Sequence, residues 1–110
     1  MKGSVNITEE IKDVTRQIIE RFNPTDIILF GSYAKGLVVK ESDIDLCVII
    51  EFGDKRKMVQ EILLETESET DLDIVVFLNE EWQKYKEDQS TFAGIIYRTG
   101  VSLIAGFYEV

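Results

Sequence analysis

A Gly-Ser pair and an Asp-x-Asp triplet, separated by ten residues, constrain this chain more than any other feature. Gly31 and Ser32 directly follow the apolar run Ile27–Phe30, and Asp43-Ile44-Asp45 opens a second apolar run. Both runs are too short for a helix and are rich in residues that suit a buried strand. The sequence therefore predicts a turn and two carboxylates at the ends of strands.

The Gly-Ser pair has the residue types of a phosphate-binding turn. A glycine at the end of a strand lets the backbone turn sharply and approach a ligand closely. Ser32 is a favourable N-cap for a short helix over Tyr33-Ala34-Lys35, and a helix start carries unpaired N–H groups that attract anions. Lys35 adds a positive charge nearby, so Gly31, Ser32 and Lys35 are candidate nucleotide-binding residues.

Two predicted strands each begin with a pair of aspartates. Since side chains alternate along a strand, Asp43 and Asp45 share one face, as do Asp71 and Asp73 in the later strand. If the strands are neighbours, three or four carboxylates meet. Two unit charges about 4 Å apart repel by about 4 kcal/mol at the effective dielectric of a protein surface, whereas Mg²⁺ prefers oxygen ligands. The cluster is therefore expected to bind metal.

The remaining pattern alternates helices and strands within one domain over residues 1–110. The expected elements are a helix from Ile7 to Phe22 with Asn6 and Glu9 as a capping pair, a helix after Gly53-Asp54 carrying Met58, Val59, Ile62 and Leu63, a helix capped by Asn79 and running to Tyr85, a helix from Ser90 to Gly100, and a strand over Val101–Ile104.

Composition narrows the function classes. The chain has 21 acidic and 12 basic residues and a net charge of −9, which argues against a nucleic-acid backbone as the main partner. Its single cysteine, Cys47, excludes an internal disulfide and is expected to be a buried residue in a reducing cytoplasm. No apolar run is long enough to cross a membrane.

Other nucleotide and metal motifs do not fit. Gly31 to Gly36 has the spacing that opens a Walker A loop, but Leu37 and Val38 stand where Lys and Ser or Thr are required. An EF-hand loop is excluded because Asp43 and Asp45 are followed by Cys47, with no glycine at the position of the sharp turn. One cysteine without histidine cannot form a zinc site.

The motif residues resemble the nucleotidyltransferase superfamily that includes DNA polymerase beta. The resemblance rests on Gly31-Ser32-Tyr33-Ala34-Lys35-Gly36, Ser42-Asp43-Ile44-Asp45-Leu46, Asp71-Leu72-Asp73-Ile74-Val75 and Asn79-Glu80-Glu81-Trp82. The resemblance covers most of the chain. The motif residues are most similar to those of the minimal, single-domain members of the superfamily. This resemblance implies an α/β (α+β) fold with a small mixed sheet of about three to five strands flanked by helices.

The resemblance also implies a reaction and roles for residues. Asp43, Asp45 and Asp73 would be catalytic and would hold two Mg²⁺ ions, while Gly31 and Ser32 would hold the triphosphate of ATP or another NTP. An acceptor hydroxyl would attack the alpha phosphorus, and the carboxylate on the third strand would help to remove its proton. Asp71 stays an alternative to Asp73, because the two share a face.

Minimal members of the superfamily resemble one half of a two-gene system whose other half is a HEPN-domain toxin. The expected function is therefore transfer of AMP from ATP to a hydroxyl, such as a tyrosine of that toxin, in an antitoxin role. Two alternatives stay open: a non-catalytic binding module of the same fold, and transfer to a small molecule such as an aminoglycoside. The sequence also leaves open whether the chain associates with a second copy of itself as a homo-oligomer.

Overall fold

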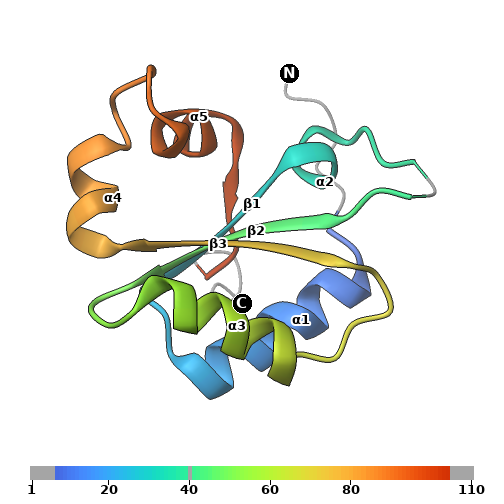
Figure 1. Cartoon of the computed structure of the whole chain (residues 1–110). Coiled ribbons are helices and arrows are strands. Elements are labelled where there is room, and N and C mark those ends of the chain that lie inside the picture. The colour runs from blue at the N-terminus through green and yellow to red at the C-terminus, as the bar shows by residue number, and fades with distance from the viewer. Residues whose placement is uncertain (1–6, 40, 105–110) are drawn as a thin grey trace.

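The computed structural model describes residues 7–39 and 41–104, and within this part of the chain a mixed sheet is flanked by helices (Figure 1). The strands are β1 (Asp26–Phe30), β2 (Ile44–Ile50), β3 (Leu72–Leu78) and β4 (Val101–Ser102), in the order β3-β2-β1-β4. β1 is antiparallel to β2 and to β4, whereas β2 and β3 are parallel. This arrangement confirms the expected α+β fold with a small mixed sheet.

Helices cover both faces of the sheet. Figure 1 shows α1 (Glu9–Phe22) and α3 (Lys55–Glu65) on one face, and α4 (Asn79–Tyr85) and α5 (Phe92–Thr99) on the other. The short helix α2 (Gly31–Lys35) follows β1 directly. Parallel strands need a crossover connection, which α3 supplies between β2 and β3. None of the described helices has the length and apolar character of a membrane span.

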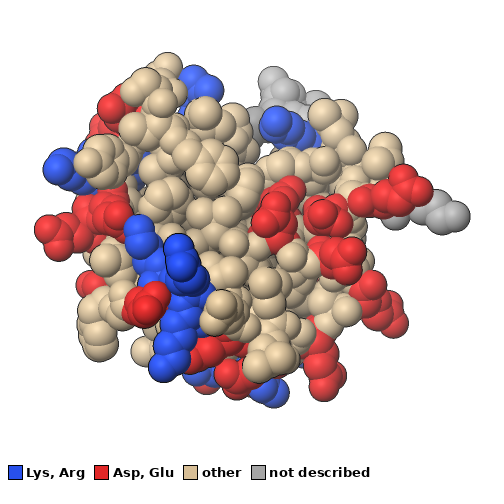
Figure 2. Space-filling view, in the orientation of Figure 1, with Lys and Arg blue, Asp and Glu red and all other residues tan. Residues whose placement is uncertain are grey.

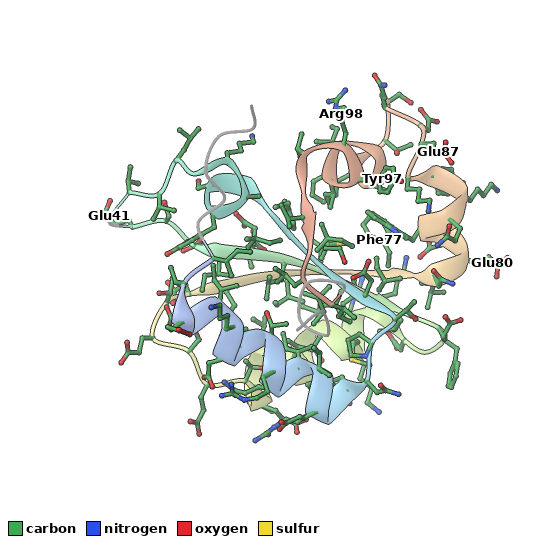
Figure 3. The ribbon with its side chains drawn as sticks, turned by 180° about the vertical axis from the view of Figure 1, so that it is seen from behind. Glu41, Phe77, Glu80, Glu87, Tyr97 and Arg98 are labelled. Carbon is green, nitrogen blue, oxygen red and sulfur yellow. The ribbon has the colours of Figure 1, made fainter. Side chains whose placement is uncertain are left out.

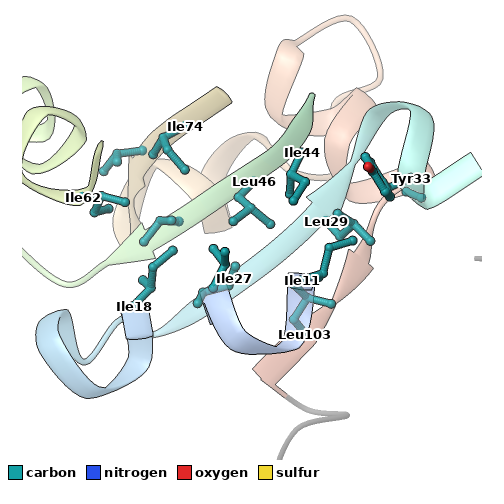
Figure 4. Close-up of a cluster of buried hydrophobic side chains, with 14 of the residues drawn as sticks. Ile11, Ile18, Ile27, Leu29, Tyr33, Ile44, Leu46, Ile62, Ile74 and Leu103 are labelled. Atoms are coloured by element: carbon teal, nitrogen blue, oxygen red, sulfur yellow. The ribbon is translucent and has the colours of Figure 1, made fainter. Parts of the chain in front are cut away.

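The larger hydrophobic core lies between the sheet and the helices α1 and α3 (Figure 4). Alternation along β1 sends Ile27 and Leu29 to this side, where both are fully buried. Helix α1 meets them with a stripe at helical spacing that includes Ile11 and Ile18, also fully buried. Burial of such side chains contributes about 1.5–3 kcal/mol each, so this core fixes α1 against the sheet.

A second, smaller core lies under α4 and α5. It takes the alternate residues of the strands, among them Ile28 and the free, buried Cys47. Trp82 of α4 is only 4% exposed and packs its ring against Phe77 and Tyr97 at centroid distances of 5.8 and 5.9 Å. Figure 3 shows Phe77 and Tyr97 in this layer, on the sheet and on α5.

The structure corrects several expected boundaries of helices. Helix α1 begins with Thr8 as its N-cap, since the Thr8 hydroxyl accepts from the Ile11 N–H at 3.1 Å, while Asn6 lies outside the described residues. Asn79 is the first residue of α4 and not its cap, because the Glu81 carboxylate accepts the Leu78 N–H at 3.1 Å.

The last two elements also begin or end differently from the sequence expectation. Thr91 caps α5, so that helix begins at Phe92 and not at Ser90. The final strand covers only Val101–Ser102 of the four residues expected. By contrast, α3 begins directly after Gly53-Asp54 as expected, with Asp54 as its N-cap.

Two side chains of α1 hold the loop that leads into β3. The Glu10 carboxylate accepts the N–H groups of Glu69 and Thr70 at 2.6 and 2.9 Å and the Thr70 hydroxyl at 2.5 Å. Gln17 exchanges two hydrogen bonds of 2.9 Å with the backbone of Glu67. These contacts fix where β3 begins, and therefore where its aspartates stand.

We expect Glu10→Ala to lower the free energy of unfolding by about 1–2 kcal/mol at pH 7, because charged acceptors make the stronger hydrogen bonds. The hydrogen bonds, led by that of the Thr70 hydroxyl, hold the pKa of Glu10 below its ordinary value. A lowered pKa gives stability that is present above the ordinary value and lost as pH falls. Urea unfolding at pH 7 and pH 3 measures both effects.

Glu9→Ala is the matched control, because the neighbouring Glu9 is exposed and its ion pair with Lys12 is long, at 3.9 Å. It should change stability by a few tenths of a kcal/mol at most. Equal effects of the two substitutions at pH 7 would contradict a special role for Glu10.

Candidate active site

The parallel pairing of β2 and β3 places Asp45 directly beside Asp73. These two residues are partners in the register of the two strands, and the Ile44 N–H donates to the Asp71 carbonyl at 2.9 Å at the head of the pair. Partners in register point to the same face of a sheet. The expectation that the two aspartate-bearing strands are neighbours is confirmed.

The Gly-Ser turn is close to the Asp45 carboxylate. β1 is antiparallel to β2 with Phe30 opposite Asp45, so the end of β1 meets the beginning of β2. Gly31 follows with a φ of 73°, and a Cβ on it would lie 2.1 Å from the Asp45 Oδ2 atom. A side chain at this position would displace the carboxylate as well as strain the backbone. Glycine is therefore required by close approach, although the atom that it approaches is a carboxylate of the chain itself.

Helix α2 begins at Gly31, two residues earlier than the sequence suggests, which corrects the role of Ser32. The helix starts at Gly31, whose positive φ makes the turn at the very end of the strand, and no side chain caps it. Ser32 is therefore within the first turn and is not the N-cap. Since Tyr33 and Ala34 are buried, Ser32 and Lys35, three residues apart, share the face away from the core.

The electrostatics of Asp45 reflect its crowded position. Partial burial is the main cause that raises the pKa of Asp45 to about 6, followed by the charge of Asp73, a hydrogen bond with Asp73 and the charge of Asp43. Burial and like charges both disfavour the ionised form. Three of the aspartates singled out in the sequence therefore act on one another.

Figure 2 shows acidic side chains gathered over the ends of β2 and β3 nearest α2. Asp43 and Asp73 are exposed there, and Asp45 is half-buried. Asp71 is also exposed, one residue before β3 begins. An apolar hollow lined by Ile11 and Leu103 lies between α1 and β4, away from these carboxylates. The acidic group is thus open to solvent and accessible to a large substrate.

The carboxylate oxygens of these aspartates are the kind of ligand that a hard divalent cation prefers. Among residues 7–39 and 41–104, no group of three or more His, Cys, Asp or Glu side chains is arranged to hold a metal ion. Mg²⁺, however, is commonly held by one or two carboxylates together with substrate phosphates and water. After burial, the negative charges of Asp73 and Asp43 contribute to the raised pKa of Asp45, and a cation would offset this part of the effect. A pair of facing carboxylates with a third nearby therefore fits Mg²⁺ that arrives with a nucleotide.

The nucleotidyltransferase domain family model matches residues 9–97, which is most of the chain. The chain therefore belongs to the nucleotidyltransferase domain family, and it is a transferase of nucleotidyl groups by that membership. A comparison with curated proteins gave no match. The family match and the geometry agree on the region that contains the Gly-Ser turn and both aspartate-bearing strands.

Sequence reasoning did not single out Phe30, which the register places opposite Asp45. Phe30 precedes Gly31 and lies on the face of the sheet that carries the carboxylates. The signal in the sequence is weak, because a phenylalanine at the end of a buried strand is normally read as core. The pairing of β1 with β2 is what brings it to the site.

We expect Asp45→Asn to raise the stability of the metal-free protein at pH 7 by about 1 kcal/mol after allowance for solvent screening. Asp45 has its pKa raised to about 6, so it disfavours the folded state where it is ionised. The wild type therefore loses stability as pH rises from about 4 through about 6. The gain from Asn should shrink as pH falls to 4, where Asp45 is protonated.

Thermal unfolding in EDTA at pH 7 and pH 4 measures this difference. Asp71→Asn is the control, because Asp71 is exposed before β3 and should change stability little at either pH. A loss of stability in Asp45→Asn, or a gain that does not depend on pH, would contradict the crowding of these carboxylates.

Proposed function

We propose that this chain transfers AMP from ATP to a hydroxyl group of a protein acceptor, with Asp43, Asp45 and Asp73 as its catalytic carboxylates. The observation that carries the proposal is the register that sets Asp45 beside Asp73 and next to the Gly31 turn. Family membership supplies the reaction class, since the match spans all of these residues. The nucleotide, the metal and the acceptor are the proposed part.

Gly31, Ser32 and Lys35 bind the triphosphate in this proposal. No side chain caps the start of α2, whose first N–H groups suit an anion, and the outward face of α2 adds the Ser32 hydroxyl and the Lys35 ammonium group. Asp43, Asp45 and Asp73 hold two Mg²⁺ ions, which supply charge stabilisation for the attacking and leaving oxygens when bound. The carboxylates orient the alpha phosphate beside the face of the sheet.

The chain's own residues then place the acceptor and receive its proton. The acceptor oxygen forms a bond to the alpha phosphorus while the bond to pyrophosphate breaks, so the products are the AMP ester of the acceptor and pyrophosphate. Asp73 takes the hydroxyl proton, because it is exposed to an incoming acceptor and adjoins Asp45. Asp45 orients the nucleotide from its more buried position.

The acceptor that we propose is a tyrosine of a HEPN-domain toxin, which gives the chain an antitoxin role in the cytoplasm. Exposed apolar residues beside the site support a protein acceptor. Leu37 and Val39, in the connection between α2 and β2, are each 67% exposed. Glu41 of the same connection lies far from α4 and α5 in Figure 3. Exposed apolar side chains of this kind suit a protein surface better than a polar aminoglycoside.

Labelled ATP tests the reaction directly. Incubation of the chain with Mg²⁺ and a HEPN-domain protein encoded beside it should transfer label from alpha-labelled ATP and none from gamma-labelled ATP. We expect Asp73→Asn to lower the rate of transfer by at least about a hundredfold, the usual contribution of a general base. Asp71→Asn is the matched control and should retain most of the rate.

Three outcomes would contradict parts of this proposal. Absence of label on the acceptor, with folded protein that binds Mg-ATP, argues against the acceptor. Loss of transfer in Asp71→Asn and not in Asp73→Asn assigns the third carboxylate to Asp71. Neutralisation of the toxin by Asp43→Asn as complete as by the wild type indicates a binding module that acts by contact alone.

A further inference from the structure

We propose that Phe92, at the start of α5, is the platform on which the base of the incoming nucleotide stacks, with Phe30 as its support. This inference rests on the proposed function, because it requires that the acidic site binds a nucleoside triphosphate. It adds a residue that positions substrate and that lies far in sequence from both motif halves.

Three residues form a row across one face of the sheet. Asp73, Asp45 and Phe30 are successive partners in the register of β3, β2 and β1. Neighbouring strands lie about 4.8 Å apart, so the row runs from two carboxylates to an aromatic ring within about 10 Å. The turn at Gly31 directly follows Phe30, so a phosphate chain bound there lies beside the same ring.

Phe92 extends this row above the sheet. Its ring centroid lies 5.9 Å from that of Phe30, with an angle of 85° between the rings. Edge-to-face packing of this kind leaves a face of a ring free for another contact. Phe92 is 51% exposed, so part of its ring is open to a ligand that is anchored at the carboxylates.

The helix that carries Phe92 is firmly seated. Thr91 caps it, and Ala93 and Ile96 are buried against β1 and α4. A Cβ on Gly94 would lie 2.0 Å from the Asp88 carbonyl oxygen, and one on Gly100 would lie 2.5 Å from Ile28 Cγ2. Close packing at both ends of α5 therefore fixes the exposed ring in place, which is what a preorganised binding group requires.

Two other aromatic side chains, Trp82 and Phe52, fit this role less well. Trp82 is 4% exposed and is part of the packing between α4 and the sheet. Phe52 is 85% exposed, but it follows the end of β2 that is opposite to Asp45. Phe92 alone among these three combines exposure with a contact to the row of site residues.

The chemical class of the ligand follows from the neighbours of the ring. Phosphate and metal chemistry on one side and an open aromatic face on the other match a nucleotide, whose base can stack on any ring. Stacking on Phe92 does not read hydrogen-bonding groups, so it strengthens the binding of ATP and GTP alike. Inorganic triphosphate has no base, so its affinity does not depend on Phe92.

Calorimetric titration of Mg-ATP and of inorganic magnesium triphosphate tests this difference. We expect Phe92→Ala to weaken the binding of Mg-ATP about tenfold, the usual effect of removing a stacked ring, and that of triphosphate less than twofold. Phe92→Trp should bind ATP at least as tightly as the wild type. Phe92→Leu retains apolar packing on Phe30 and should lose ATP affinity as the alanine variant does.

Phe52→Ala is the matched control, because it removes an exposed phenylalanine at the other end of β2 and should change neither affinity. Equal weakening of ATP and triphosphate by Phe92→Ala, or no weakening of either, overturns the platform. So does a change confined to the KM of the protein acceptor, which would make Phe92 an acceptor-docking residue. Failure of the wild type to bind either ligand overturns the nucleotide site itself, and the platform with it.

Discussion

The repulsion between Asp45 and Asp73 is the constraint on which the rest of the site depends. Parallel pairing of β2 and β3 sets the two carboxylates side by side, and partial burial then raises the pKa of Asp45 to about 6. A fold gains no stability from such a pair. The presence of this pair beside a glycine turn is explained if cations and phosphates bind there and offset the repulsion.

The surrounding structure holds this unfavourable pair in place. The core between α1, α3 and the sheet fixes the strands, and α3 supplies the crossover that makes β2 and β3 parallel. Glu10 and Gln17 of α1 hold the loop from which β3 begins. Stability generated in the core therefore offsets strain at the site, a common arrangement in proteins that bind charged ligands.

Much of the fold follows from the sequence because its patterns are local. The apolar runs before Gly31 and after Asp45 mark two strands, and Asp54 marks the start of α3. The helix starts were predicted less well, because Thr8 and Thr91 as caps, and Glu81 within the first turn of α4, stand close to other residues that could serve in their place. The residues of the site likewise fall into those predicted from local motifs and those that depend on the tertiary structure. The aspartates are visible as a repeated motif, whereas the position of Phe30 opposite Asp45 and the contact with Phe92 depend on strand pairing and helix packing across the chain.

The central claim is that the carboxylates at the heads of β2 and β3 form one cation and nucleotide site with the Gly31 turn. Nuclear magnetic resonance with paramagnetic Mn²⁺ and α,β-methylene ATP tests this claim most directly, because relaxation caused by the bound Mn²⁺ broadens the signals of nearby backbone amides. The account predicts that the amides of Gly31, Asp45 and Asp73 broaden first and together. Broadening centred on the acidic surface of Glu9, Asp13 and Glu69, or spread evenly over acidic residues, would contradict it.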